Sequence, residues 1–205
     1  MGTQDDDEIT STNQPDVIRA LDGFDDVSAG ARGDELYGGK PGDRLAGEEG
    51  NDTYYGGGGA DFFTEYEGGF EDASSGDDVM YGGGGNDFME GNDGNDILKG
   101  QAGDEIDAGS RKDIEMFGDA GNDKLYGGPG DDGLAGEEGT DKHYGGPGND
   151  YIDASYFDPA RAPDLVDGGD GYDVCIVDEN DDPVVNCERI EVVPGLEPVS
   201  ATNAR

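Results

Sequence analysis

A period of nine residues runs through most of the chain and constrains its fold more than any other feature. Eighteen nine-residue units can be placed from residue 2 onward, and position 6 is Asp in 16 of 18 of them. Position 8 is apolar in 16 of 18 units, position 1 is Gly in 13 and position 4 is Gly in 12. A bland acidic linker has no reason to keep such a frame, so the repeat predicts a solenoid of stacked units.

The units fall into three groups along the chain. Residues 2–64 hold seven consecutive units, residues 73–153 hold nine, and residues 159–176 hold the last two. An irregular insertion at 65–72 and an interruption at 154–158 separate these groups. We therefore expect two long arrays and a short third one.

Each unit divides into a turn (positions 1–6) and a short strand (positions 7–9). Glycine in the turn permits positive φ and leaves carbonyl groups unobstructed. Because side chains alternate along a strand, position 8 points inward while positions 7 and 9 point outward. The predicted thin core contains Ile9, Ile18, Val27, Leu36 and Leu45, followed by Met80, Met89, Leu98, Met116, Leu125, Leu134 and Ile152.

The units resemble the RTX, or haemolysin-type, calcium-binding nonapeptide GGxGxDxUx, in which U is a large apolar residue. The best copies are GGGGNDFME (82–90), GGPGDDGLA (127–135) and GGPGNDYID (145–153), and the resemblance covers residues 2–176. It implies an all-β, right-handed parallel β-roll in which two units make one coil. It also implies several Ca²⁺ ions, each held between turns on the same edge by position-6 carboxylates and backbone carbonyls.

The charge of the chain agrees with a cationic partner. Acidic residues outnumber basic ones 51 to 12, and the formal charge is −39. Phosphates would be repelled, which argues against a nucleic acid partner, whereas Ca²⁺ prefers many oxygen ligands. So thin a core cannot order the chain unaided, and we expect calcium binding and folding to be linked.

The predicted metal ligands are the aspartates at position 6. Two units apart, as in Asp132 and Asp150, they should share an edge, while Asp87 and Asp96 should lie on opposite edges. The first two units lack most of the glycines and are expected to act as caps, so two of these carboxylates can be structural only. The frame breaks around 104–117, which predicts a bulge or a weakened site and leaves those residues out. The set is Asp7, Asp16, Asp25, Asp34, Asp43, Asp52, Asp61, Asp78, Asp87, Asp96, Asp123, Asp132, Asp141, Asp150, Asp164 and Asp173.

The C-terminal part departs from the repeat. Residues 177–193 are expected to form a β-hairpin that caps the open end of the roll, stapled by a Cys175–Cys187 disulfide. A lasting disulfide and millimolar calcium both point to a secreted, extracellular protein. Residues 1–10 do not resemble a secretory signal and leave the export route open. Residues 194–205 are expected to be a disordered tail.

Several aromatic residues and one histidine lie outside this account. Tyrosines recur at outward position 9, and the stripe they form either contacts a sugar or protein or simply suits a strand. Tyr66, Phe70, Tyr156 and Phe157 in the irregular segments either contact a partner or, as we favour, cover gaps in the core. His143 occupies a core position and is expected to be a packed imidazole.

Three functional hypotheses remain open on the sequence. The first is a secreted calcium-binding module that acts as a structural scaffold or adhesin. The second is the calcium-folded accessory domain of a secreted protease or lipase, and the third is a toxin fragment. No HExxH or GxSxG motif occurs and no apolar run is long enough to span a membrane. We therefore expect no enzymatic activity and favour the first hypothesis.

Overall fold

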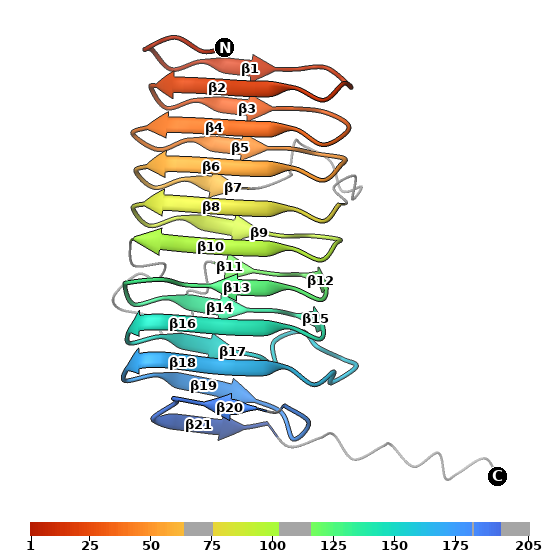
Figure 1. Cartoon of the computed structure of the whole chain (residues 1–205), viewed down its shortest axis with the longest axis vertical. Coiled ribbons are helices and arrows are strands. Elements are labelled where there is room, and N and C mark those ends of the chain that lie inside the picture. The colour runs from red at the N-terminus through yellow and green to blue at the C-terminus, as the bar shows by residue number, and fades with distance from the viewer. Residues whose placement is uncertain (64–75, 103–115, 182, 194–205) are drawn as a thin grey trace, which may run out of the picture.

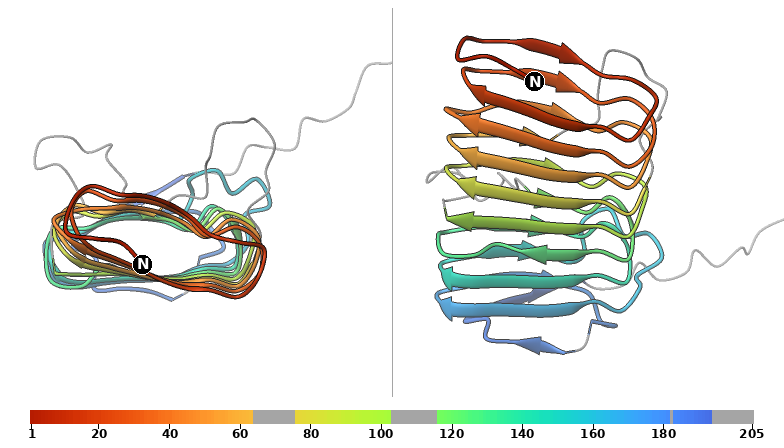
Figure 2. Two further views of the ribbon diagram at one scale, coloured as in Figure 1. Left: turned by 90° about the horizontal axis from the view of Figure 1, so that it is seen from above. Right: turned by 45° about the horizontal axis from the view of Figure 1, so that its top comes forward.

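The computed structural model describes residues 1–63, 76–102, 116–181 and 183–193. In these residues the chain winds into a flattened coil whose two long sides are parallel β-sheets (Figures 1 and 2). Apart from two short strands in the turns, consecutive strands alternate between the two sheets, and each strand pairs with the next strand of its own sheet along the chain. The predicted parallel β-roll, with two units to each coil, is confirmed.

The first sheet (sheet A) contains ten short strands in the described residues. They are β1 (Glu8–Thr10), β3 (Asp26–Ser28), β5 (Arg44–Ala46), β7 (Phe62–Phe63), β9 (Phe88–Glu90), β11 (Met116–Phe117), β14 (Gly133–Ala135), β17 (Tyr151–Asp153), β19 (Val174–Val177) and β21 (Arg189–Val192).

The second sheet (sheet B) contains nine strands there, most of them longer. They are β2 (Val17–Asp22), β4 (Glu35–Lys40), β6 (Thr53–Gly58), β8 (Val79–Gly84), β10 (Ile97–Ala102), β13 (Lys124–Tyr126), β16 (Lys142–Gly148), β18 (Leu165–Gly171) and β20 (Val184–Val185). A further small sheet joins β12 (Ala120–Gly121) to β15 (Glu138–Gly139) in neighbouring turns.

The core lies between the two sheets and consists of position-8 side chains. In β4 and β6, Leu36 and Tyr54 are fully buried, whereas their neighbours in the strand are not. Most long strands of sheet B continue into the glycine-rich start of the next unit, which the sequence assigned to the turn. Because glycine has no side chain, successive coils can approach closely there, and their backbones pair in register, as Gly39 does with Gly57.

The register shows how the coil accommodates departures from the repeat. Neighbouring coils are usually 18 residues apart, as in the pairing of Leu36 with Tyr54. The spacing is 26 residues between Asp52 and Asp78 and 23 between Asp150 and Asp173. Met116 pairs with Met89, and Leu98 pairs with Leu125. The continuous frame, which would pair Leu98 with Met116, is therefore wrong here. The bulge predicted around 104–117 falls mostly on residues outside the described ones.

The C-terminal segment is not a hairpin. Strand β20 pairs in parallel with β18 of sheet B, and β21 pairs in parallel with β19 of sheet A. The predicted β-hairpin cap is therefore wrong, because the segment continues the solenoid by another coil. The predicted Cys175–Cys187 disulfide is present, with 6.1 Å between the Cα atoms, and it ties this coil to the core strand β19.

Candidate metal sites in the turns

The position-6 aspartates form two ladders, one along each edge of the roll. The backbone N–H of Asp34 donates to Oδ1 of Asp52, one coil later, at 2.6 Å. On the other edge, the N–H of Asp43 donates in the same way to Oδ1 of Asp61 at 2.7 Å. Asp132 and Asp150 are linked likewise at 3.0 Å, so they share an edge as predicted. These bonds fix each carboxylate with one oxygen engaged and the other facing into the turn.

The second carboxylate oxygen, Oδ2, is the chemically distinctive atom of these turns. In twelve of the interior turns it is buried and receives no hydrogen bond. Buried carboxylate oxygens are costly to leave unpaired, because burial removes their water without replacing it. The residues with such an oxygen are Asp25, Asp34, Asp43, Asp52, Asp61, Asp87, Asp96, Asp123, Asp141, Asp150, Asp164 and Asp173.

Glycine at position 1 leaves open the space that these oxygens face. A Cβ built on Gly91 would lie 2.7 Å from Oδ2 of Asp96 and 2.7 Å from the carbonyl oxygen of Gly118 in the next coil. Gly118 repeats the arrangement, at 2.6 Å from Oδ2 of Asp123 and 2.7 Å from the carbonyl oxygen of Gly136. A carboxylate and a carbonyl from successive coils thus face one small space, and Ca²⁺ takes both kinds of oxygen ligand.

Burial strongly perturbs the acidity of these carboxyl groups. Desolvation penalises the charged form and raises the pKa, and repulsion between successive aspartates adds to the effect in most of them. The pKa rises to about 8 for Asp96, Asp123 and Asp164, to about 7 for Asp52, Asp61 and Asp150, and to about 6 for Asp87 and Asp141. A cation beside the carboxylates would favour the charged form, so its binding should release protons.

The two N-terminal turns are built differently. The hydroxyl of Thr3 donates to Oδ2 of Asp7 at 2.8 Å. The hydroxyls of Ser11 and Thr12 donate to Oδ2 of Asp16 at 2.6 and 2.9 Å. These hydrogen bonds lower the pKa of Asp16. Protein donors here occupy the oxygen that is unpaired in the interior turns, which fits the expectation that the first units are caps.

Two acidic residues that the sequence did not suggest extend the ladders at the C-terminal end. The N–H of Asp164 donates to Oδ1 of Asp181 at 3.1 Å, and the N–H of Asp173 donates to Oε2 of Glu188 at 2.8 Å. These partners lie 17 and 15 residues along the chain and outside any glycine-rich unit. The nine-residue frame therefore gave no signal for them.

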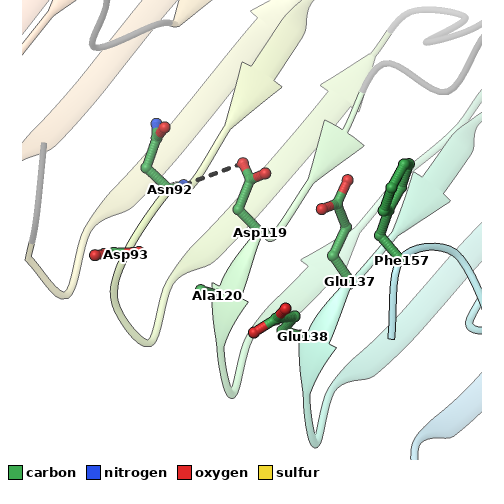
Figure 3. A pocket seen from close by; sticks show the side chains of 7 residues that line it. All are labelled: Asn92, Asp93, Asp119, Ala120, Glu137, Glu138 and Phe157. Atoms are coloured by element: carbon green, nitrogen blue, oxygen red, sulfur yellow. Dashed lines mark hydrogen bonds between the residues drawn. The ribbon is translucent and has the colours of Figure 1, made fainter. Parts of the chain in front are cut away.

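A second acidic feature lies outside the ladders, at turn positions 2 and 3 of three successive coils. It is a shallow hollow lined by Asn92, Asp93, Asp119, Ala120, Glu137, Glu138 and Phe157 (Figure 3). Burial raises the pKa of Glu137 to about 7, and Asp119, Glu90 and Glu138 add repulsion. Across the described residues, however, no three acidic, Cys or His side chains converge as a metal centre would require. The carbonyl oxygens of the position-1 glycines are further oxygen ligands within reach of a cation in the turns.

The comparison with known protein families gives the same assignment. The chain matches the RTX calcium-binding nonapeptide repeat over residues 1–31, 28–63, 72–105, 115–142 and 144–155. The chain belongs to this family. No curated protein matches it. This RTX chain is thus a calcium-binding repeat module, and the match ends before the coil that contains Asp181 and Glu188.

The remaining sequence predictions have mixed outcomes. His143 is a fully buried core residue, as expected, and burial lowers its pKa to about 4. Tyr37 and Tyr55 stack at 4.6 Å between ring centroids on the outer face of sheet B, so they share a face as predicted. Tyr156 and Phe157 do not cover the core as we favoured, because they are 37% and 70% exposed.

Tyr66 and Phe70 lie outside the described residues. Within the described part of the chain, no helix has the length and apolar character needed to cross a membrane.

Proposed function

We propose that this RTX chain folds by binding several Ca²⁺ ions between the turns of successive coils and then acts as an extracellular structural scaffold or adhesin-like module. The observation that carries the proposal is the row of buried Oδ2 atoms without a hydrogen-bond partner in the interior turns. A roll with these atoms ionised and unpaired would be unstable, because each carries the desolvation cost of a buried charge.

The ligands proposed are the twelve aspartates with such an oxygen, together with the carbonyl groups of the position-1 glycines. Asp78 and Asp132 occupy equivalent places in the frame and are included. Asp7 and Asp16 are assigned as structural caps, because hydroxyl groups already occupy their second oxygens. Bound calcium supplies positive charge between stacked carboxylates, and the residues orient those carboxylates through the N–H ladder.

The extracellular assignment is supported by the disulfide and by the affinity expected of such sites. Extracellular calcium modules typically bind with dissociation constants of about 10⁻⁴ to 10⁻³ M. Both cysteines of the chain are joined in the Cys175–Cys187 bridge, and such bridges persist in oxidising compartments. A row of aromatic rings on sheet A, with Phe62 exposed and Phe88 and Phe117 half-buried, offers a surface for an extracellular partner.

The test is a calcium titration of the purified chain, followed by circular dichroism and small-angle X-ray scattering. We expect an expanded chain without β signal in chelator and a compact, elongated β-protein in millimolar Ca²⁺. Mg²⁺ is the matched control, because it demands octahedral geometry and shorter ligand distances. A chain that is equally ordered after all divalent metal has been removed would refute the proposal.

A further inference from the structure

The last coil of the roll contains an arrangement that repeats an interior turn with different residues. In the interior, Oδ2 of Asp150 and the carbonyl oxygen of Gly168 both lie where a Cβ on Gly145 would sit. One coil later, Oδ2 of Asp173 and the carbonyl oxygen of Asn186 lie in the same way against Gly168. Asn186 thus takes the place that Gly168 has in the preceding turn.

The carboxylate of this last turn comes from Glu188. The N–H of Asp150 donates to Oδ1 of Asp173 at 2.8 Å, and the N–H of Asp173 donates to Oε2 of Glu188 at 2.8 Å. Glu188 follows Asn186 by two residues, whereas Asp173 follows Gly168 by five. The additional methylene of glutamate helps the carboxylate to reach the ladder from this shorter turn.

The environment of the Asp173 carboxylate is a second feature that points to a ligand. The side chain of Asp173 is fully buried, and Oδ2 has no hydrogen-bond partner. Burial and, after it, repulsion from Glu188 raise the pKa of the Asp173 carboxyl. On the opposite edge the last carboxylate differs, because the N–H of Asp178 donates to Oδ2 of Asp181 at 2.7 Å. The buried Oδ2 of Asp164 on that edge also has no partner, but there both oxygens of the last carboxylate, Asp181, accept hydrogen bonds from backbone N–H groups.

The residues of this turn are held by the disulfide. Cys187 lies between Asn186 and Glu188 and is bonded to Cys175, which is fully buried in strand β19. Asn186 is fixed further by its side-chain amide, which donates to Oδ1 of Asp167 at 2.8 Å. The bridge therefore holds the carbonyl group of Asn186 and the carboxylate of Glu188 against the preceding coil.

We infer that Asp173, the Asn186 carbonyl and Glu188 form an additional, terminal Ca²⁺ site, whose ligands the Cys175–Cys187 disulfide holds in place. The site lies beyond the residues that match the RTX family. It rests on the proposed function, since it uses the same chemistry as the interior turns. It also makes calcium binding at the end of the roll depend on the redox state of the bridge.

The experiment counts bound Ca²⁺ by native mass spectrometry and compares the full-length chain with two variants. Glu188→Gln keeps an oxygen that can accept from the N–H of Asp173 but removes the charge, so we expect one ion fewer per chain. Glu179→Gln is the matched control, because this exposed glutamate in the same segment makes no contact with the ladder, and it should keep the full count. Equal counts for Glu188→Gln and the unaltered chain would overturn the terminal site.

A second measurement tests the disulfide. Reducing the calcium-loaded chain with a phosphine should remove the same ion, and reducing Glu188→Gln should remove no further one. If the reduced chain keeps every ion, the bridge does not hold the site. A chain that binds no calcium at all would instead refute the proposed function, so the two failures are distinguishable.

Discussion

The N-terminal turns and the interior turns of this roll solve the same electrostatic problem by different means. At Asp16, hydroxyl groups from Ser11 and Thr12 donate to the second carboxylate oxygen. At Asp96, glycine replaces the serine, and the equivalent oxygen is buried without a donor. The first arrangement is complete within the protein, whereas the second requires a proton or a cation. Calcium dependence is therefore a property of individual turns and does not follow from the acidic composition alone.

The largest effect that would test this contrast is expected on the stability of the calcium-free roll when the pH is lowered in chelator. Eight of the interior aspartates have carboxyl pKa values raised to about 6–8, so the folded state takes up protons at a higher pH than the unfolded state. The stability of the calcium-free roll should therefore rise as the pH falls from about 8 towards 4. We expect part of the β signal to appear by circular dichroism at pH 5 and to vanish at pH 8.

With calcium present the direction should reverse, because protons compete for the same oxygens and weaken binding as the pH falls. A calcium-free chain that is equally disordered at pH 5 and pH 8 would contradict the assignment of the interior oxygens.

The next largest effect is expected from Gly91→Ala. The added Cβ would lie 2.7 Å from Oδ2 of Asp96 and from the carbonyl oxygen of Gly118, which closes the proposed ion site. A site with calcium at ten times its dissociation constant contributes about 1.4 kcal/mol, and the overlap adds to this loss. Thermal unfolding in calcium measures the change. Gly84→Ala is the control, because its Cβ would make an ordinary 3.8 Å contact, and an equal loss in both variants would argue against the site.

A smaller and more specific effect is expected from Asp96→Asn. In calcium the variant should lose about 1.4 kcal/mol of unfolding free energy at ten times the dissociation constant, since one ion is lost. In chelator it should be more stable than the unaltered chain, because the amide removes a buried carboxylate whose pKa is raised to about 8. Asp16→Asn should show no such reversal. Denaturant unfolding in calcium and the residual β signal by circular dichroism in chelator distinguish the two residues, and parallel behaviour would show that the turns do not differ.

The smallest effect is expected where the N-terminal turn is converted into an interior one. Replacing both Ser11 and Thr12 by glycine removes the hydroxyl donors to Asp16, so strands β1 and β2 should need more calcium for protection than in the unaltered chain. Hydrogen exchange over residues 8–22 along a calcium titration measures this difference. Thr10→Ala, a change at an exposed strand residue nearby, should leave the titration unaltered. The same calcium dependence in the double variant and the unaltered chain would mean that the hydroxyls do not substitute for an ion.

Much of this architecture can be predicted from the sequence because the repeat specifies local geometry in every unit. Leu36 and Asp34 occupy their expected places, one in the core and one in the ladder. What the repeat cannot specify is the chain where the frame fails. Leu98 pairs with Leu125 and not with Met116. The nine-residue spacing is compatible with either pairing, so it does not predict this change of register.

The C-terminal coil was missed for a related reason. The sequence around Cys187 alternates like a hairpin, and two strands joined by a short turn can pair with each other or each with the previous coil. The structure selects the second, and the disulfide is compatible with both. Glu188 could not be assigned as a ligand from the sequence, because its role depends on the carbonyl of Asn186 and on the parallel register of β21 with β19.

The hydrogen bonds of the ladder all have the same direction, and this gives the solenoid a polarity. Each aspartate N–H donates to a carboxylate of the coil that follows it, as Asp43 does to Asp61. Within the ladder, removing coils from the N-terminal end leaves carboxylate acceptors, which water can satisfy, whereas removing the last coil leaves the N–H groups of Asp164 and Asp173 without Asp181 and Glu188. Each coil is thus completed by its successor, so shortening the chain from its C-terminus should be more damaging than an equal loss from its N-terminus.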